Sequence, residues 1–412
     1  MNIYGIIILA ALLFEYALNL IADLLNRRTL SADLPKEFVG VYSPDAYMKS
    51  QNYTRTRTNF GIVESTFSLV ITLVFWFAGG FNYLDQTVLQ LQYGNLVTGL
   101  IFIALLLLFR SILSLPFSVY STFVIEEKFG FNKTTSKTFI LDIVKGLLLG
   151  VLLGGPLLLG ILAFFQYAGS LAWLYCWMTA SVFILFVQFI APTWIMPLFN
   201  KFTPLESGEL KNAILSYAKS VNFSLRDVFM MDGSKRSSKS NAFFTGFGRN
   251  KRIALFDTLI KKHTVAELVA VLAHEIGHYK KKHILQGIVI SIVQMGVMFF
   301  LMSFFISSKD LFDAFFMQNV SIYAGLLFFG LLFTPIEFLL SLALNALSRK
   351  NEFEADRFSV TTIENSETMV DALKKLSVDN LSHLTPHPFY IFLNYSHPPV
   401  LERIKTIRSI LK

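Results

Sequence analysis

Long apolar runs recur along the chain and alternate with polar stretches. A transmembrane helix needs roughly 20 consecutive, mostly apolar residues. Seven segments reach about that length, at residues 3–22, 62–82, 96–118, 146–167, 171–193, 284–306 and 321–347. The pattern therefore predicts seven membrane-spanning helices. The fourth and fifth segments leave a second possibility open, because a re-entrant hairpin would give the same charge pattern.

Two long polar stretches lie outside these spans. In the first, two short alternating runs at Asn241–Phe247 and Arg252–Phe256 flank Gly248-Arg249-Asn250, which predicts a β-hairpin. Thr264 followed by Glu267 is typical of a capping box and predicts the start of a helix. The expected organisation is a group of five N-terminal spans, a first polar part with the hairpin and the capped helix, a pair of spans, and a second polar part; their bounds are 1–194, 195–283, 284–348 and 349–412.

Composition supports a membrane protein. Apolar residues make up 54% of the chain and charged residues 16%, with 42 Phe, and a soluble protein of this size cannot hide so much apolar surface. The net charge of +8 is explained by loop bias, since no nucleic-acid motif accompanies it. Cys176 is the sole cysteine, so the chain forms no internal disulfide.

Basic residues alternate between the loops in step with the spans. The 23–60 loop carries six Lys and Arg residues and the 119–145 loop four lysines, whereas the 83–95 loop has no basic residue and the 307–320 loop has only Lys309. By the positive-inside rule, this predicts an outside N-terminus and places both polar parts in the cytoplasm.

The predicted helix after Thr264 contains His274-Glu275-Ile276-Gly277-His278. Residues four apart lie on one face of a helix, so His274 and His278 are able to bind one zinc ion. Glu275 is then placed to act as general base on a metal-activated water. The alternative is a pair of exposed histidines on a charged helix end, because three lysines follow at 280–282.

Glu352 is the expected third metal ligand. The sixth and seventh spans form an antiparallel hairpin with its turn near Asp313, which returns Glu352 to the level of His278. Asp356, one helical turn further, is expected to accept a hydrogen bond from a ligand histidine. Glu354 lies on another face and is the weaker candidate. The alternative for residues 351–356 is a solvated, charged helix start.

Two histidines and a glutamate with an open position are typical of a hydrolytic zinc site. A tetrahedral oxyanion needs further donors, and His397, before Pro398-Pro399, is a candidate. Its alternative is a plain helix-start residue. His263 and His283 do not share the metal face well by spacing, and His383 and His387 are expected on the surface.

Further segments accompany these residues in order along the chain: Ile125–Asn132 (IEEKFGFN), Pro197–Pro204 (PLFNKFTP), Ser240–Phe244 (SNAFF) and Ser396–Pro399 (SHPP). With the zinc motif and Glu352-x-x-x-Asp356, they resemble the M48 zinc peptidases and, among these, the type 1 CAAX prenyl proteases, or Ste24-like membrane proteases. The resemblance implies an all-α integral membrane protein with seven transmembrane helices enclosing a chamber. It also implies a zincin-like α+β catalytic domain on the cytoplasmic side.

The same resemblance implies cleavage near the C-terminus of prenylated CAAX proteins, with Zn²⁺ as cofactor. It implies that Asn241, Phe243 and His397 bind substrate or stabilise the oxyanion. The strand that begins at Asn241 would pair with extended peptide, which suits an edge strand beside a zinc site. Expected partners are protein or peptide substrates and membrane lipids, but no nucleic acid.

Two departures from the family bear on location. The chain ends without a dilysine retrieval signal and is short for a eukaryotic member, so a bacterial inner membrane is expected rather than the endoplasmic reticulum. Bacteria generally do not prenylate their proteins, which leaves a quality-control protease independent of prenylation as an alternative. A transporter with a non-catalytic metal site is a third reading, although the chain shows no repeated halves.

Overall fold

The computed structural model of the chain describes residues 1–225, 227–245 and 252–410. The helices are α1 (Ile3–Arg28), α2 (Pro44–Phe77), α3 (Gly80–Leu89), α4 (Asn95–Tyr120), α5 (Ser136–Leu149), α6 (Gly155–Tyr167), α7 (Ala172–Ile190), α8 (Met196–Phe199), α9 (Glu209–Ser220), α10 (Asp257–Lys262), α11 (Val265–Lys280), α12 (His283–Phe305), α13 (Lys309–Asp313), α14 (Ile322–Thr362), α15 (Glu367–Asp379), α16 (Pro388–Asn394) and α17 (Val400–Ile410). The strands are β1 (Phe202–Pro204), β2 (Asp227–Met231), β3 (Ala242–Thr245) and β4 (Arg252–Phe256).

Within the described residues, seven helical segments are long and apolar enough to cross a membrane: Ile3–Arg28, Pro44–Phe77, Asn95–Glu126, Ser136–Tyr167, Gly169–Phe199, His283–Phe305 and Ile322–Thr362. The predicted number is confirmed. The segments that contain the fourth and fifth predicted spans have 32 and 31 residues, which is long enough to cross the membrane. Several helices begin or end well outside the apolar runs, because helical hydrogen bonding continues through polar sequence.

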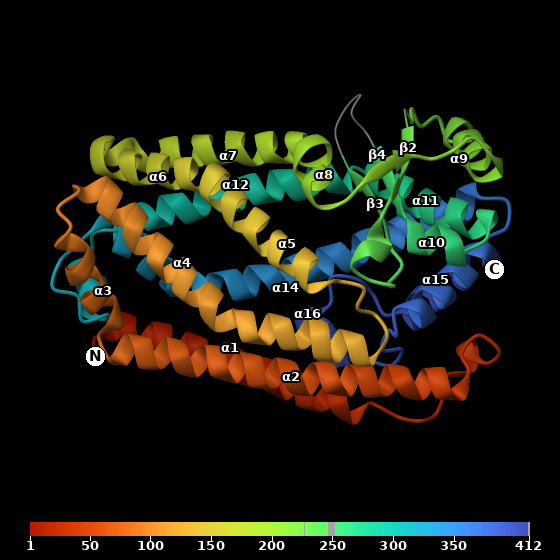
Figure 1. Cartoon of the computed structure of the whole chain (residues 1–412), viewed down its shortest axis with the longest axis horizontal. Coiled ribbons are helices and arrows are strands. Elements are labelled where there is room, and N and C mark those ends of the chain that lie inside the picture. The colour runs from red at the N-terminus through yellow and green to blue at the C-terminus, as the bar shows by residue number, and fades with distance from the viewer. Residues whose placement is uncertain (226, 246–251, 411–412) are drawn as a thin grey trace.

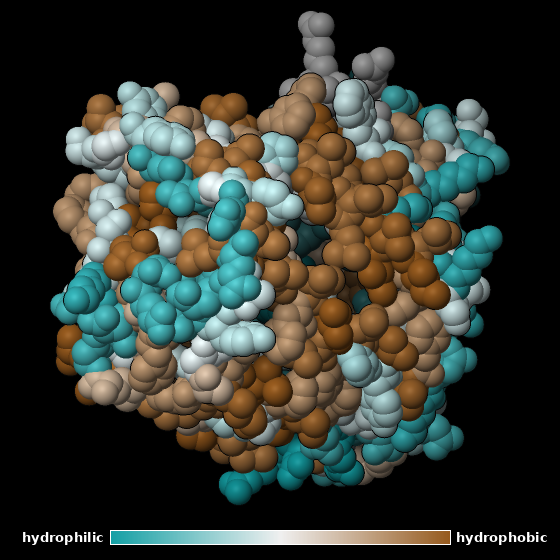
Figure 2. Space-filling view, turned by 60° about the vertical axis from the view of Figure 1, so that its left-hand side comes forward, coloured by the Kyte–Doolittle hydropathy of each residue, from teal (hydrophilic) through white to brown (hydrophobic). Residues whose placement is uncertain are grey.

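The membrane helices surround a central space (Figure 1). Helices α1 and α2 lie together along one long side, α6, α7 and α12 lie along the opposite side, and α4 and α5 cross between them. A cavity of about 760 Å³ is lined by α1, α2 and α16, and its lining includes the charged side chains of Glu15, Asp23 and Arg57. Figure 2 shows the outer surface hollowed between apolar residues. The predicted fold, seven helices enclosing a chamber, is confirmed.

An aromatic cluster closes the end of the molecule that lies away from the sheet. Phe315 stacks on Phe328 with ring centroids 4.0 Å apart, and on Trp76 at 4.7 Å. The buried Trp76 indole donates to the carbonyl of Ala314 at 2.8 Å. These contacts tie α2 and the segment after α13 to the start of α14, so the helices meet in a packed core at this end.

The opposite end carries a small sheet with strand order β1-β2-β4-β3. Strands β3 and β4 pair antiparallel, as the predicted hairpin requires, whereas its turn at 248–250 lies outside the described residues. The sequence did not predict β1 or β2, and β2 pairs parallel with β4. Strand β3 forms an edge of the sheet and lies beside α11.

Two helices carry the residues of interest. Helix α11 begins with the predicted capping box, in which Thr264 N donates to Glu267 Oε2 at 2.9 Å and Glu267 N donates to Thr264 Oγ1 at 3.3 Å. Helix α14 has 41 residues, a length of about 60 Å, so it crosses the membrane and continues into the polar part. Its last turns pack against α11.

Candidate functional site

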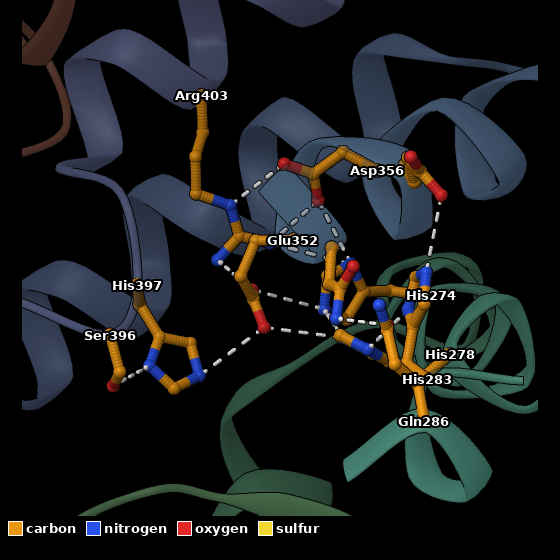
Figure 3. Close-up of polar contacts among 11 residues, drawn as sticks. His274, His278, His283, Gln286, Glu352, Asp356, Ser396, His397 and Arg403 are labelled. Atoms are coloured by element: carbon orange, nitrogen blue, oxygen red, sulfur yellow. Dashed lines mark hydrogen bonds and ion pairs between the residues drawn. The ribbon is translucent and has the colours of Figure 1, made fainter. Parts of the chain in front are cut away.

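Three side chains from α11 and α14 meet at one point. His274 Nε2 and His278 Nε2 lie 3.1 Å apart, Glu352 Oε2 lies 3.4 Å from His274 Nε2, and Glu352 Oε1 lies 3.2 Å from His278 Nε2 (Figure 3). Glu352 is only 4% exposed. The structure thus brings together the three residues that the sequence proposed as metal ligands.

The geometry of this cluster fits a metal ion. Tetrahedral ligands at about 2.1 Å from zinc are separated from one another by about 3.4 Å, close to the three distances here. Glu352 Oε2 is buried and has no hydrogen-bond donor among the described residues. A cation in contact with this oxygen would remove the cost of leaving a buried acceptor unpaired.

Asp356 holds the outer nitrogen of the first histidine. Its Oδ1 lies 2.9 Å from His274 Nδ1, and the carboxylate is completely buried. Arg403 of α17 binds the same carboxylate at two points, with Nε to Oδ2 at 2.8 Å and Nη2 to Oδ1 at 2.6 Å. A ligand histidine bound in this way keeps its Nε2 directed at the cluster.

Glu275 lies beside the cluster and lines a cavity of about 420 Å³ together with His278. Burial raises the pKa of its carboxyl group above the ordinary value. A general base works best when its pKa is near the operating pH, so this shift suits Glu275 to take and return a proton.

His397 approaches the cluster from the loop before α17. Its Nε2 lies 3.3 Å from Glu352 Oε1, Ser396 Oγ lies 3.0 Å from its Nδ1, and its side chain is 66% exposed. Its ring also lines a cavity of about 460 Å³. This cavity shares Asn380, Ser382, His383, Asn394 and Tyr395 with the central cavity. The two cavities are therefore neighbours, and the second of them reaches His397.

Asn241 and Phe243 are located at the edge strand. Asn241 is exposed immediately before β3, and Phe243 packs its ring edge-to-face on Phe256 at 6.2 Å. Among the described residues, neither side chain is hydrogen-bonded to the metal cluster. Phe243 lies in β3 and Asn241 directly before it, and this strand packs against α11.

Two contacts near the site were not predicted from the sequence. Arg403 carries no motif, and only the fold brings it to Asp356. His283 does not share the metal face, as expected, yet it contacts the outer nitrogen of His278 at 3.1 Å.

The remaining histidines lie outside the cluster, as predicted for His263. The expectation of surface positions for His383 and His387 is wrong: both are half-buried, and His387 accepts a hydrogen bond from Phe389 N at the start of α16. Burial lowers the pKa of His383 to about 4. His263 is buried between Glu267 and Asp379.

Comparison with known proteins agrees with this arrangement. Residues 23–201 match the family described as CAAX prenyl protease N-terminal, five membrane helices, and residues 204–411 match peptidase family M48. The chain is 36% identical over 411 residues to the CAAX prenyl protease 1 homolog of Oryza sativa subsp. japonica, covering 98% of this chain and 96% of that protein. The identity to the CAAX prenyl protease 1 homolog of Homo sapiens is 32%, over 97% of this chain and 95% of the relative.

A solved structure is similar over its whole length. The crystal structure of S. mikatae Ste24p superimposes with a TM-score of 0.93 at 33% identity, covering 99% of both chains. Likeness at this level of identity and coverage extends from the membrane helices to the catalytic part. The chain therefore belongs to the M48 peptidases, as a membrane metallopeptidase of the CAAX prenyl protease 1 group.

Proposed function

We propose that this chain is an integral-membrane zinc endopeptidase in which His274, His278 and Glu352 hold the metal. The observation that carries the proposal is the convergence of their three ligand atoms within 4.8 Å of one another. Two histidines and one carboxylate that leave a position open form the donor set of hydrolytic zinc sites. Membership in a metallopeptidase family leaves a transporter with no support.

Each neighbouring side chain then has a role. Zinc, when bound, supplies a Lewis acid that polarises a carbonyl and lowers the pKa of water. Glu275 accepts the proton of the attacking water and passes it to the leaving amine. His397 directs its Nε2 toward the cluster, where it donates to the developing oxyanion. Asp356 orients His274.

Substrates enter as extended C-terminal segments. The relatives are named CAAX prenyl proteases, which favours CAAX proteins as substrates. Among the described strands, β3 lies at the edge of the sheet beside α11, and we expect a peptide to add there as a further strand with Asn241 and Phe243 at its start. The two polar parts, 195–283 and 349–412, act as one catalytic unit, since α11 packs on both α14 and α15.

The sequence and the relatives differ on which cellular membrane holds the protein. The named relatives are eukaryotic, so they favour the endoplasmic reticulum over the bacterial inner membrane that the sequence predicted. The charge pattern of the loops supports a cytoplasmic catalytic unit.

The carboxylate of Glu275 provides the sharpest test of the mechanism. Glu275→Gln removes the base and keeps the side-chain volume. The purified variant should bind zinc as the wild type does and cleave a farnesylated CAAX peptide roughly 10²–10⁴-fold more slowly. His274→Ala should lose the zinc itself. Cleavage by Glu275→Gln at the wild-type rate would overturn the proposed mechanism.

Prenylation needs a separate comparison. Matched peptides, one farnesylated and one carrying the free thiol, distinguish CAAX processing from general quality control. A higher kcat/KM for the farnesylated peptide supports CAAX processing. Equal values favour the protease that ignores prenylation.

A further inference from the structure

The outer nitrogen of His278 lies against a second histidine. His278 Nδ1 lies 3.1 Å from His283 Nδ1, and His283 Nε2 lies 3.2 Å from Glu354 Oε2 (Figure 3). The His283 side chain is 7% exposed, and Glu354 is 40% exposed. The second histidine of the metal motif is thus the first member of a chain of side chains that ends at a carboxylate.

His283 is not placed as a fourth metal ligand. His278 directs Nε2 toward His274 and Glu352, and it directs Nδ1, on the other side of the ring, toward His283. The two rings meet at an interplanar angle of 74°, with centroids 5.2 Å apart. The 3.1 Å between the two nitrogens is a hydrogen-bond distance, and such a bond tolerates rotation of one ring plane against the other about its axis.

One arrangement of protons satisfies every contact. A metal ligand uses the lone pair on His278 Nε2, so the proton of this neutral ring is on Nδ1. That N–H donates to the lone pair on His283 Nδ1, which leaves the His283 proton on Nε2. The Nε2–H then donates to the Glu354 carboxylate, an acceptor without protons of its own.

A break in the helix makes this contact possible. In a continuous helix, residues five apart point about 140° away from each other and do not meet. Helix α11 ends at Lys280, Lys282 adopts the left-handed conformation at φ 61°, and α12 begins at His283. Asn351 Nδ2 donates to Gln286 Oε1 at 3.1 Å, which ties the first turn of α12 to α14.

We propose that His283, supported by Glu354, is a positioning residue that fixes the tautomer and ring orientation of His278 toward the metal. The inference rests on the proposed zinc site. His283 contacts the outer nitrogen of His278, as Asp356 contacts the outer nitrogen of His274. Removal of such outer partners typically weakens metal affinity 10- to 100-fold.

The test measures zinc affinity, by chelator competition on the purified full-length protein. His283→Ala should weaken zinc binding roughly 10- to 100-fold. His283→Gln should recover part of the loss, because its amide oxygen offers an acceptor to His278. Glu354→Ala should weaken binding less than His283→Ala, and Glu354→Gln less again. Lys350→Ala is the control, since Lys350 is exposed and lies 3.9 Å from the same carboxylate.

Two further readouts separate positioning from folding and from failure of the zinc site. The Tm of zinc-free protein should be alike in wild type and His283→Gln, and the absorption spectrum of the Co²⁺-loaded protein should change in His283→Ala. Zinc affinity within twofold of wild type in both His283→Ala and Glu354→Ala would overturn the inference while the zinc site stands. A wild-type protein that binds no zinc would overturn the proposed function and the inference together.

Discussion

The buried carboxylate of Asp356 lies among charged and polar partners. The carboxylate is fully buried, and it is matched by a two-point contact from Arg403 and by His274. Arg403 Nη1 also lies 3.6 Å from Glu352 Oε2. A buried charge is tolerated only while its partners remain, so this arginine supports both the fold of α17 on α14 and the orientation of the first ligand histidine.

Replacing this arginine should therefore be costly. Arg403→Leu leaves the Asp356 carboxylate buried without its cation, an effect of about 3–5 kcal/mol in stability. Zinc affinity should fall as well, because Asp356 then loses its fixed orientation. Arg403→Lys should rescue only partly, since an ammonium group does not reproduce the two-point contact. Thermal unfolding of the detergent-solubilised protein and its zinc content are the measurements.

Arg408, on the same helix, is the matched control. It pairs with Glu37 at 2.7 Å, but both side chains are more than a third exposed. An exposed pair contributes about 0–1 kcal/mol, so Arg408→Leu should change the Tm little. Equal losses of Tm in the two leucine variants would contradict the role assigned to Arg403.

Helix packing sets the distance between the candidate metal ligands. Gly277 faces α14 at its closest approach to α11, and a Cβ atom there would lie 3.1 Å from both Cα and the carbonyl oxygen of Ala355. Gly277 immediately precedes His278, and Ala355 lies between Glu352 and Asp356 in the chain. The absent side chain of Gly277 therefore lets the two ligand-bearing helices come together.

Adding one methyl group at this crossing should separate the helices. Because the atoms in the way belong to the backbone, Gly277→Ala should cost about 1–3 kcal/mol and weaken zinc binding. Gly287→Ala in α12 is the control, since no atom lies within 4 Å of its added Cβ. Alanine favours a helix by about 0.8–1 kcal/mol over glycine, so this variant should have an equal or higher Tm and keep its zinc. A Gly277→Ala protein with wild-type zinc affinity would refute the argument.

Local sequence patterns account for some elements of the structure and not for others. The spans, the capping box at Thr264 and the β3–β4 pair follow from local patterns of apolar and polar residues. Proximity of Glu352 to His278 follows from the hairpin of spans alone. Strands β1 and β2 are short and depend on sheet pairing, so they have no local pattern of their own. The His283 contact depends on a left-handed residue at Lys282, which helical spacing does not anticipate.

At the scale of the whole molecule, α14 joins the membrane helices to the catalytic unit without interruption. It passes from the aromatic cluster at one end of the chamber to Glu352 and Asp356 at the other. The candidate site and α3 therefore lie at opposite ends of α14, on opposite sides of the membrane (Figure 1). By the positive-inside rule, we expect the catalytic end to face the cytoplasm.

The single cysteine makes this orientation directly testable. Cys176 is fully buried, and Cys176→Ser gives a background without thiols. Into it, Tyr83→Cys places a thiol on α3, where Tyr83 is 76% exposed, and Lys261→Cys places one on α10, where the Lys261 side chain is 72% exposed. In sealed microsomes with their cytoplasmic face outward, a membrane-impermeant maleimide should label Lys261→Cys at once and Tyr83→Cys only after detergent is added. The reverse order would place the catalytic unit in the lumen, and the proposed cleavage of cytoplasmic C-terminal segments would then be wrong.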